Sequence, residues 1–195
     1  MKKYQIIYVD PPWSYNDKMS GHSFSLDHEY QTQGLEWIKA IGGGLKDMTD
    51  KSCTLFIWAV SPLLPEAFEV IEAWGFKFKT VAFCWVKKHK SGITVKNLGR
   101  WTMGGMELCL LATKGSPKRI RNNIKQIIED IRESHSAKPP IVREKIVELM
   151  GDLPRIELFA RKNPQNRLDG TNTFDGWDVW GNEVKSDIEL VEKST

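Results

Sequence analysis

An aspartate, two prolines and a tryptophan follow the first apolar run of the chain, at Asp10, Pro11, Pro12 and Trp13. The run before them, residues 6–9, is rich in β-branched and aromatic side chains and is typical of a buried strand. Two prolines remove two backbone donors, so the strand must end there and must present Asp10 at its carboxyl end. In open α/β sheets, ligands bind at that edge.

These residue types suit chemistry at the exocyclic amine of a nucleobase. The lone pair of that amine is delocalised into the ring, so an enzyme that alkylates it needs acceptors that bind the amine hydrogens. The Asp10 carboxylate and the Pro11 carbonyl are such acceptors, Pro12 fixes the turn, and Trp13 can stack on an extruded base. The alternative is a strand terminator with a solvated aspartate and a core tryptophan, and Asp-Pro-Pro alone leaves both interpretations open.

Further segments follow in an order that resembles a known family. D-P-P-W after I-I-Y-V resembles the catalytic motif of the MT-A-seventy-like family of S-adenosylmethionine-dependent N(6)-adenine methyltransferases. The motif with the later segments in order is far more specific than the motif alone. The later segments that share the resemblance are residues 55–58, 63–75, 80–87, 99–101, 107–115, 135–139, 156–161 and 177–184.

The resemblance implies an S-adenosylmethionine site in the C-terminal half of the chain. It places Lys138 at the carboxylate of the cofactor and lets Asp10 face the ammonium group. A glutamate inside an apolar strand is costly unless its carboxylate is hydrogen-bonded, and ribose hydroxyls would supply such hydrogen bonds to Glu157. From the residues alone, an exposed lysine before a helix is the preferred interpretation of Lys138. The other implied cofactor residues are Phe159, Arg161, Asn182 and Glu183.

Two long polar connections are candidates for substrate contact. Residues 87–102 are rich in lysine, and basic residues beside an aromatic ring suit phosphate contact with base stacking. Residues 14–33 follow the catalytic motif directly, and we predict that this loop closes over the substrate. Solvated surface loops are the alternative for both. The side chains selected as substrate contacts are Tyr15, Lys87, Lys88, Arg100 and Trp101.

Hydrophobic patterning predicts alternating strands and helices. Gly42, Gly43 and Gly44 are interpreted as a helix stop, and Ser61 as a helix N-cap. Residues 120–132 have helical spacing, but the resemblance places a short strand near Ile127, which we favour. Predicted strands cover residues 6–9, 53–60, 76–86, 107–113 and 155–159, and predicted helices cover residues 35–41, 61–74 and 140–150.

This order predicts an α/β fold with parallel strands and crossover helices. The resemblance implies a Rossmann-like methyltransferase sheet in circularly permuted order, with the catalytic strand first and the cofactor strand last. We predict one methyltransferase domain over residues 1–184 and a frayed tail over residues 185–195. Two features depart from the family: only nine residues precede Asp10, where members often have a further cofactor strand, and the loop 162–176 is long.

Composition narrows the class of protein. The chain has 195 residues and a net charge of +3, which neither demands nor excludes a nucleic-acid partner. Cys53, Cys84 and Cys109 have no C-x-x-C spacing and are predicted to be reduced thiols, and the four scattered histidines predict no metal site. No apolar run is long enough to cross a bilayer, so we expect a cytoplasmic protein, or a nuclear one in a eukaryote.

The function predicted is methyl transfer from S-adenosylmethionine to the N(6) amine of adenine in nucleic acid. We favour DNA over RNA, because so compact a chain resembles stand-alone prokaryotic or viral members. One alternative is a catalytically silent, nucleic-acid-binding subunit that scaffolds an active methyltransferase. Another is a methyltransferase for a small molecule or a different base. A second copy of the chain, or a related subunit, is the protein partner that these interpretations allow.

Overall fold

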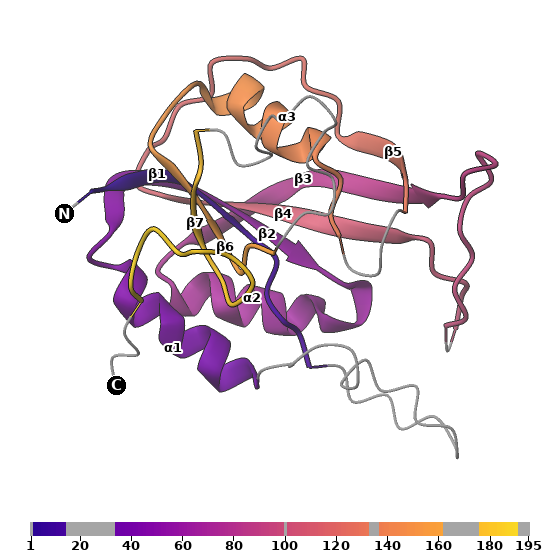
Figure 1. The fold of residues 1–195 in the computed structure, drawn as a ribbon, viewed down its shortest axis with the longest axis horizontal. Coiled ribbons are helices and arrows are strands. Elements are labelled where there is room, and N and C mark those ends of the chain that lie inside the picture. Colours follow the sequence, from indigo (N-terminus) through magenta and orange to yellow (C-terminus); the bar gives the residue numbers. More distant parts are fainter. Residues whose placement is uncertain (1, 15–33, 100, 133–136, 162–175, 191–195) are drawn as a thin grey trace.

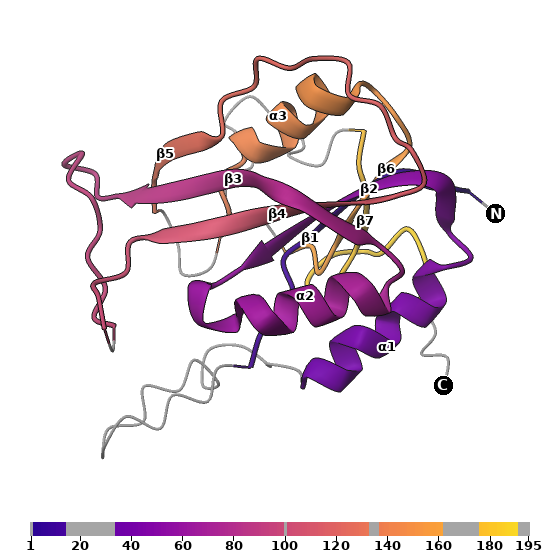
Figure 2. The ribbon, with the colours of Figure 1, turned by 180° about the vertical axis from the view of Figure 1, so that it is seen from behind.

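The computed structural model describes residues 2–14, 34–99, 101–132, 137–161 and 176–190. Seven strands form one mixed sheet in the order β5-β3-β4-β2-β1-β6-β7. Helices α1 (Leu35–Leu45) and α2 (Leu64–Ala73) cover one face of the sheet, and α3 (Ile141–Met150) covers the other (Figures 1 and 2). The strands are β1 (Tyr4–Val9), β2 (Thr49–Ala59), β3 (Lys77–Lys88), β4 (Met106–Lys114), β5 (Ile127–Ile131), β6 (Arg155–Leu158) and β7 (Asp178–Trp180).

The strand that begins the chain lies inside the sheet. β1 pairs in parallel with β2 on one side and with β6 on the other, which places Tyr8 beside Phe56 and Glu157. β4 lies between β2 and β3 and is antiparallel to both. β2 and β3 therefore run in the same direction, as the predicted crossover through α2 requires, whereas β4 departs from the parallel arrangement because β3 and β4 are joined as a hairpin. The parallel strands end at one edge, called the carboxyl edge below, and β4 begins there.

Side chains that alternate along the strands form two cores. On β1, Ile7 and Val9 join the cluster under α1 and α2, whereas Ile6 and Tyr8 join the cluster under α3. All three cysteines are free, as predicted. No helix in the described ranges has the length and apolar character of a membrane span. The tryptophans predicted for the core are buried, and these are Trp58, Trp74 and Trp85.

Helix α1 runs straight through the glycine triplet and ends at Leu45, so the predicted helix stop is wrong. Gly42 is buried against the ring of Trp74, and a Cβ atom at this position would lie 2.3 Å from Cδ1 of that ring. The Trp74 indole also donates a hydrogen bond to the carbonyl of Ile38 at 3.0 Å. Close packing of α1 against the end of α2 therefore requires glycine here, and this tertiary contact outweighs the local preference of glycine for helix ends.

The start of α2 also differs from the prediction. Residues Ser61–Leu63 form a short 3-10 turn with no side-chain cap, and α2 begins at Leu64. The amide of Leu63 donates to the carbonyl of Val60 at 2.9 Å, so the backbone closes the turn without the Ser61 hydroxyl. The strand favoured near Ile127 is confirmed as β5.

The chain after β7 folds back on the sheet. The Asp187 carboxylate accepts a hydrogen bond from the Val179 amide at 2.9 Å, and the Asp187 amide donates to the Val179 carbonyl at 2.9 Å. Ile188 and Leu190 pack against the core under α1 and α2. These contacts satisfy backbone groups of the edge strand β7. Residues 191–195 lie outside the described residues.

Candidate active site

Asp10 lies at the carboxyl edge, directly after β1, as its two prolines predict. Its side chain is 20% exposed and therefore still reaches solvent. The buried Pro11 accepts a hydrogen bond from the Trp13 amide at 2.8 Å, which makes a tight turn. A carbonyl oxygen has two lone pairs, so Pro11 retains one. The turn therefore holds one carboxylate and one partly free carbonyl close together at the edge.

Trp13 is anchored by its indole nitrogen. The indole N–H donates to the carbonyl of Trp58 at 2.9 Å, and the half-buried ring packs against the core under α1 and α2. The Trp58 indole in turn donates to the hydroxyl of Tyr8 at 2.7 Å. Trp13 is thus fixed to β2 while part of its ring stays accessible beside Asp10.

The ammonium group of Lys138 bridges two carboxylates at this edge. It lies 2.7 Å from Oδ2 of Asp10 and 3.2 Å from Oε2 of Glu107, and 5.6 Å from the centre of the Trp58 ring. Lys87 pairs with the other oxygen of Glu107. Burial lowers the pKa of Lys138, but Asp10 and Glu107 raise it further, to above its usual value. Asp10, Glu107, Lys138 and Lys87, called the edge cluster below, therefore carry two positive and two negative charges.

Glu107 is the member of the edge cluster that the sequence analysis did not select. It reaches the carboxyl edge because β4 runs antiparallel and starts there, opposite Trp85 of β3. Burial raises the pKa of this carboxyl, but Lys138 and Lys87 outweigh burial and lower it to about 2. The only signal in the sequence was a single glutamate at the head of an apolar strand. Without the strand order, its lysine partners could not be identified.

Acid is expected to destabilise the protein through Glu107. The folded pKa of about 2 lies below the ordinary 4.5, so the stabilisation is complete above about pH 4.5 and is lost as the pH falls toward 2. Between pH 6 and pH 3 this loss is about 2 kcal/mol. Urea unfolding at both pH values should show a loss smaller by that amount in Glu107→Gln. Equal losses in wild type and variant would contradict the assignment.

A second buried ion pair, between Arg143 and Glu157, joins α3 to β6 next to the strand that precedes Asp10. Both oxygens of Glu157 accept hydrogen bonds from Arg143 on α3, from Nε at 2.5 Å and from Nη2 at 2.7 Å. The guanidinium also lies 5.7 Å from the centre of the Tyr8 ring. Burial raises the pKa of Glu157 although Arg143 opposes it. The bond that Glu157 needs therefore comes from a residue not selected in the sequence, and its contact with a ribose stays a prediction.

The chain turns sharply where β6 ends. Phe159 has φ of 57°, a left-handed conformation that is rare for a bulky residue and is often found at ligand sites. Its ring centre lies 5.9 Å from that of Trp37 and 5.3 Å from that of Trp180. These three rings form an aromatic wall at the end of β6 and β7. The remaining predicted cofactor residues follow the same two strands: Arg161 is half-buried, and Asn182 and Glu183 are exposed.

The predicted substrate contacts divide into three groups. Lys87 is bound within the edge cluster, and Lys88 pairs with Glu129 at 2.8 Å, so both ammonium groups already have carboxylate partners. The sequence could not show this, because those carboxylates come from β4 and β5. Trp101 is 96% exposed on the connection between β3 and β4. Tyr15, Arg100 and residues 15–33 of the predicted closing loop lie outside the described residues.

The side chains at the carboxyl edge fit the groups of S-adenosylmethionine. The cofactor has an ammonium group, a carboxylate and an adenine ring to satisfy. Asp10 supplies a carboxylate, and the ammonium of Lys138 has three donors, of which Asp10 and Glu107 use two. The aromatic wall of Trp37, Phe159 and Trp180 supplies apolar ring surface at the neighbouring strand ends.

Comparison with known proteins gives the same family as the sequence resemblance. The family model MT-A70 matches residues 4–183. A curated relative, Type II methyltransferase M.MunI from Mycoplasma sp, is 34% identical over 202 residues, which cover 94% of this chain and 78% of the relative. The chain therefore belongs to the MT-A70 family and is an S-adenosylmethionine-dependent N(6)-adenine methyltransferase.

Proposed function

We propose that this protein methylates the N(6) amine of adenine in DNA. The observation that carries the proposal is the rigid pair of acceptors at the carboxyl edge, the Asp10 carboxylate and the Pro11 carbonyl. The choice of DNA rests on the relative named as a type II methyltransferase, a class that modifies DNA. Its similarity extends over nearly the whole of this chain.

The acceptors act by binding the two hydrogens of the adenine amine. Held in this way, the nitrogen turns its lone pair out of the plane of the ring and toward the incoming carbon. S-Adenosylmethionine supplies that carbon as the methyl group of a sulfonium ion. Lys138 and Glu107 keep Asp10 in place, and Trp13 packs on the base. In this proposal Asp10 also takes the proton that the methylated amine loses. Catalysis is then mainly positioning and electrostatics.

The cofactor is held, in this proposal, between the ends of β1, β6 and β7. The third donor of Lys138 binds the carboxylate, and Asp10 faces the ammonium group. The adenine lies near Phe159, and the ribose is bound by groups that follow β6 and β7. Those groups are Glu157, Arg161, Asn182 and Glu183.

The sheet also supports a permuted order of a Rossmann-like methyltransferase fold. The catalytic strand β1 is first in the chain and yet central in the sheet, with β6 and β7 from the end of the chain beside it. In an unpermuted order, strands that bind the cofactor would precede the catalytic strand. In the proposed order, β1, β6 and β7 together build both halves of the site.

The connection between β3 and β4 has the properties of a nucleic-acid contact. It projects beyond the sheet at the carboxyl edge (Figure 1). Residues 89–105 contain no aspartate or glutamate and include Lys90 and Lys96. Leu98 and Trp101 are 92% and 96% exposed, which is unusual for such large apolar side chains. Positive charge with an exposed aromatic ring suits phosphate contact and base stacking.

Replacing Trp101 by alanine is expected to lower kcat/KM for DNA by about tenfold, since stacking on one base contributes about 1–3 kcal/mol. The free energy of unfolding should stay within about 0.5 kcal/mol of wild type, because the side chain is almost fully exposed. Methylation kinetics and urea unfolding measure the two effects. Trp101→Phe keeps an aromatic face and should retain most of the activity. An unchanged kcat/KM in the alanine variant would remove this side chain from the substrate interface.

The proposed function is tested with donor that carries a labelled methyl group. The protein is incubated with single- and double-stranded DNA and RNA, and the products are digested to nucleosides. We expect N(6)-methyladenine from DNA. Label in RNA alone would overturn the choice of substrate. Binding of S-adenosylmethionine in a calorimeter separates the alternative, because a silent subunit should bind none.

A further inference from the structure

The connection between β3 and β4 ends in a narrow arm that carries large apolar side chains at its tip. Figures 1 and 2 show the arm leaving the sheet at the carboxyl edge and turning toward the side on which α1 and α2 lie. At its far end, Leu98, Trp101 and Met103 are all more than half exposed. Large apolar side chains gathered on one projecting tip have no core to enter, and such a group marks a contact with another molecule.

Backbone hydrogen bonds hold the arm together up to this tip. Asn97 and Gly104 exchange both N–H···O bonds, at 2.7 and 2.9 Å, directly before it. The two sides of the arm approach closely, since a Cβ atom on Gly105 would lie 2.4 Å from the carbonyl oxygen of Val95. Leu98 follows the last of these backbone contacts, so its side chain is presented by a hydrogen-bonded segment.

The root of the arm belongs to the edge cluster. The amide of Lys87 donates to the carbonyl of Gly105 at 2.9 Å. The side chain of the same lysine pairs with Glu107, and Lys138 links that carboxylate to Asp10. The arm is therefore joined to the catalytic carboxylate by a backbone hydrogen bond and a chain of ion pairs, which fixes the direction in which it leaves the site.

The proposed reaction requires a base to leave its duplex. The adenine amine of a base pair is hydrogen-bonded to thymine, so the adenine must be extruded before the Asp10 carboxylate and the Pro11 carbonyl can bind its hydrogens. Extrusion removes stacking and leaves a space between the neighbouring base pairs. Proteins that open or kink a duplex insert an apolar side chain between base steps, and leucine is one of those used.

We propose that Leu98 is a wedge that enters the duplex where the target adenine has left it. This inference rests on the proposed methylation of DNA and goes beyond it, because it assigns the residue that keeps the base out of the helix. The charge of the arm fits this role: residues 89–105 contain no aspartate or glutamate, and Lys90 and Lys96 attract the phosphates beside the gap. Trp101, on the same tip, stacks on a neighbouring base.

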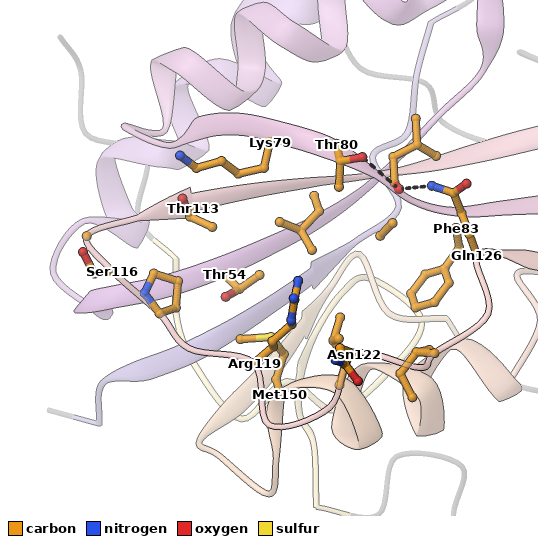
Figure 3. Close-up of a pocket in the computed structure, with 17 residues that line it drawn as sticks. Thr54, Lys79, Thr80, Phe83, Thr113, Ser116, Arg119, Asn122, Gln126 and Met150 are labelled. Atoms are coloured by element: carbon orange, nitrogen blue, oxygen red, sulfur yellow. Dashed lines mark hydrogen bonds between the residues drawn. The ribbon is translucent and has the colours of Figure 1, made fainter.

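The arm and the ring proposed to pack on the base lie on one side of the sheet. Trp13 packs against the core under α1 and α2, which is the side toward which the arm turns. The cavity that Figure 3 shows is on the opposite, α3 side, and none of the described residues between 89 and 105 lines it. The wedge therefore acts with the carboxyl edge, and substitutions at the tip leave that cavity intact.

Two duplexes that differ only opposite the target adenine test the wedge. One pairs the adenine with thymine, and the other places it opposite an abasic site, from which it is extruded at little cost. Leu98→Ala is expected to lower kcat/KM by about tenfold on the paired duplex and by less than about twofold on the abasic one. Leu98→Met keeps an apolar side chain of similar volume and should retain most of the activity on both.

Extrusion is also measured directly with 2-aminopurine at the target position of the paired duplex. Its fluorescence rises when the base leaves the stack. Wild-type protein should increase the fluorescence, and Leu98→Ala should increase it less at a saturating protein concentration. Equal increases would overturn the wedge, because the base would then leave the helix without the leucine.

Folding and position are controlled separately. Urea unfolding of Leu98→Ala should match that of wild type, because the side chain lies almost wholly in solvent. Ile93→Ala removes another exposed apolar side chain, from the turn that follows β3, and should not change the ratio of the two activities. An equal loss on both duplexes in Leu98→Ala, or no loss on the paired one, would overturn the wedge. If wild-type protein methylates neither duplex, the proposed function fails, and the wedge with it.

Discussion

Replacing Asp10 by alanine is expected to slow methyl transfer by on the order of 10³-fold and to leave the protein folded. The carboxylate is the charged member of the acceptor pair at the end of β1, and alanine offers nothing to bind the amine hydrogens. The Pro11 carbonyl would remain, but one acceptor cannot turn the amine out of the plane of the ring. Single-turnover transfer of labelled methyl groups to an adenine-containing duplex measures the loss directly.

The folded state should tolerate this change because Lys138 keeps a second partner. Without Asp10, its ammonium still lies 3.2 Å from Oε2 of Glu107. Asp10→Asn is the matched control: the amide oxygen is one acceptor in the same place, so its rate should fall between those of wild type and Asp10→Ala. Donor affinity, measured separately, distinguishes lost chemistry from lost cofactor binding. Transfer at the wild-type rate by Asp10→Ala would remove this residue from the mechanism.

The local chemistry of the chain was enough to predict where the catalytic motif lies. Proline prevents the strand from continuing, and this effect does not depend on the rest of the fold, so Asp10 had to follow β1. The same kind of local argument failed for Gly42, because the contact with Trp74 comes from another helix. Glycine permits a helix end, but it also permits close packing, and the sequence does not show which one applies.

The partners of the site residues depended on strand order, which the pattern of apolar residues did not reveal. Glu107 reaches Lys138 only because β4 enters the sheet in the opposite direction. Arg143 reaches Glu157 only because α3 crosses the face that β6 presents. For the same reason, Lys87 was expected to contact phosphate but is bound to Glu107. Single residues with a charge could be selected from the sequence, whereas the pairing of charges required the topology.

Replacing Lys138 by methionine is expected to have the largest effect on stability of any change in the edge cluster. The side chain is 10% exposed and compensates two carboxylates, those of Asp10 and Glu107. Methionine fills a similar volume without charge, so the two acids would face each other with only Lys87 nearby. Breaking a buried ion pair in this way costs about 3–5 kcal/mol. Urea unfolding at pH 7 measures the loss, and Lys125→Met, at an exposed lysine, is the control.

The pH dependence of the stability of Lys138→Met distinguishes a loss of charge compensation from a loss of packing. In wild type, the low pKa of Glu107 means that acid removes stability. In Lys138→Met, Glu107 loses one of the two lysines that lower its pKa, so this pKa rises and the stability lost as the pH falls from 7 toward 3 should be smaller than in wild type. Methyl transfer should be lost as well, because Asp10 is no longer held against the end of β1. A variant that loses stability equally at both pH values would show that Lys138 acts through packing, and that the edge cluster does not position the catalytic carboxylate.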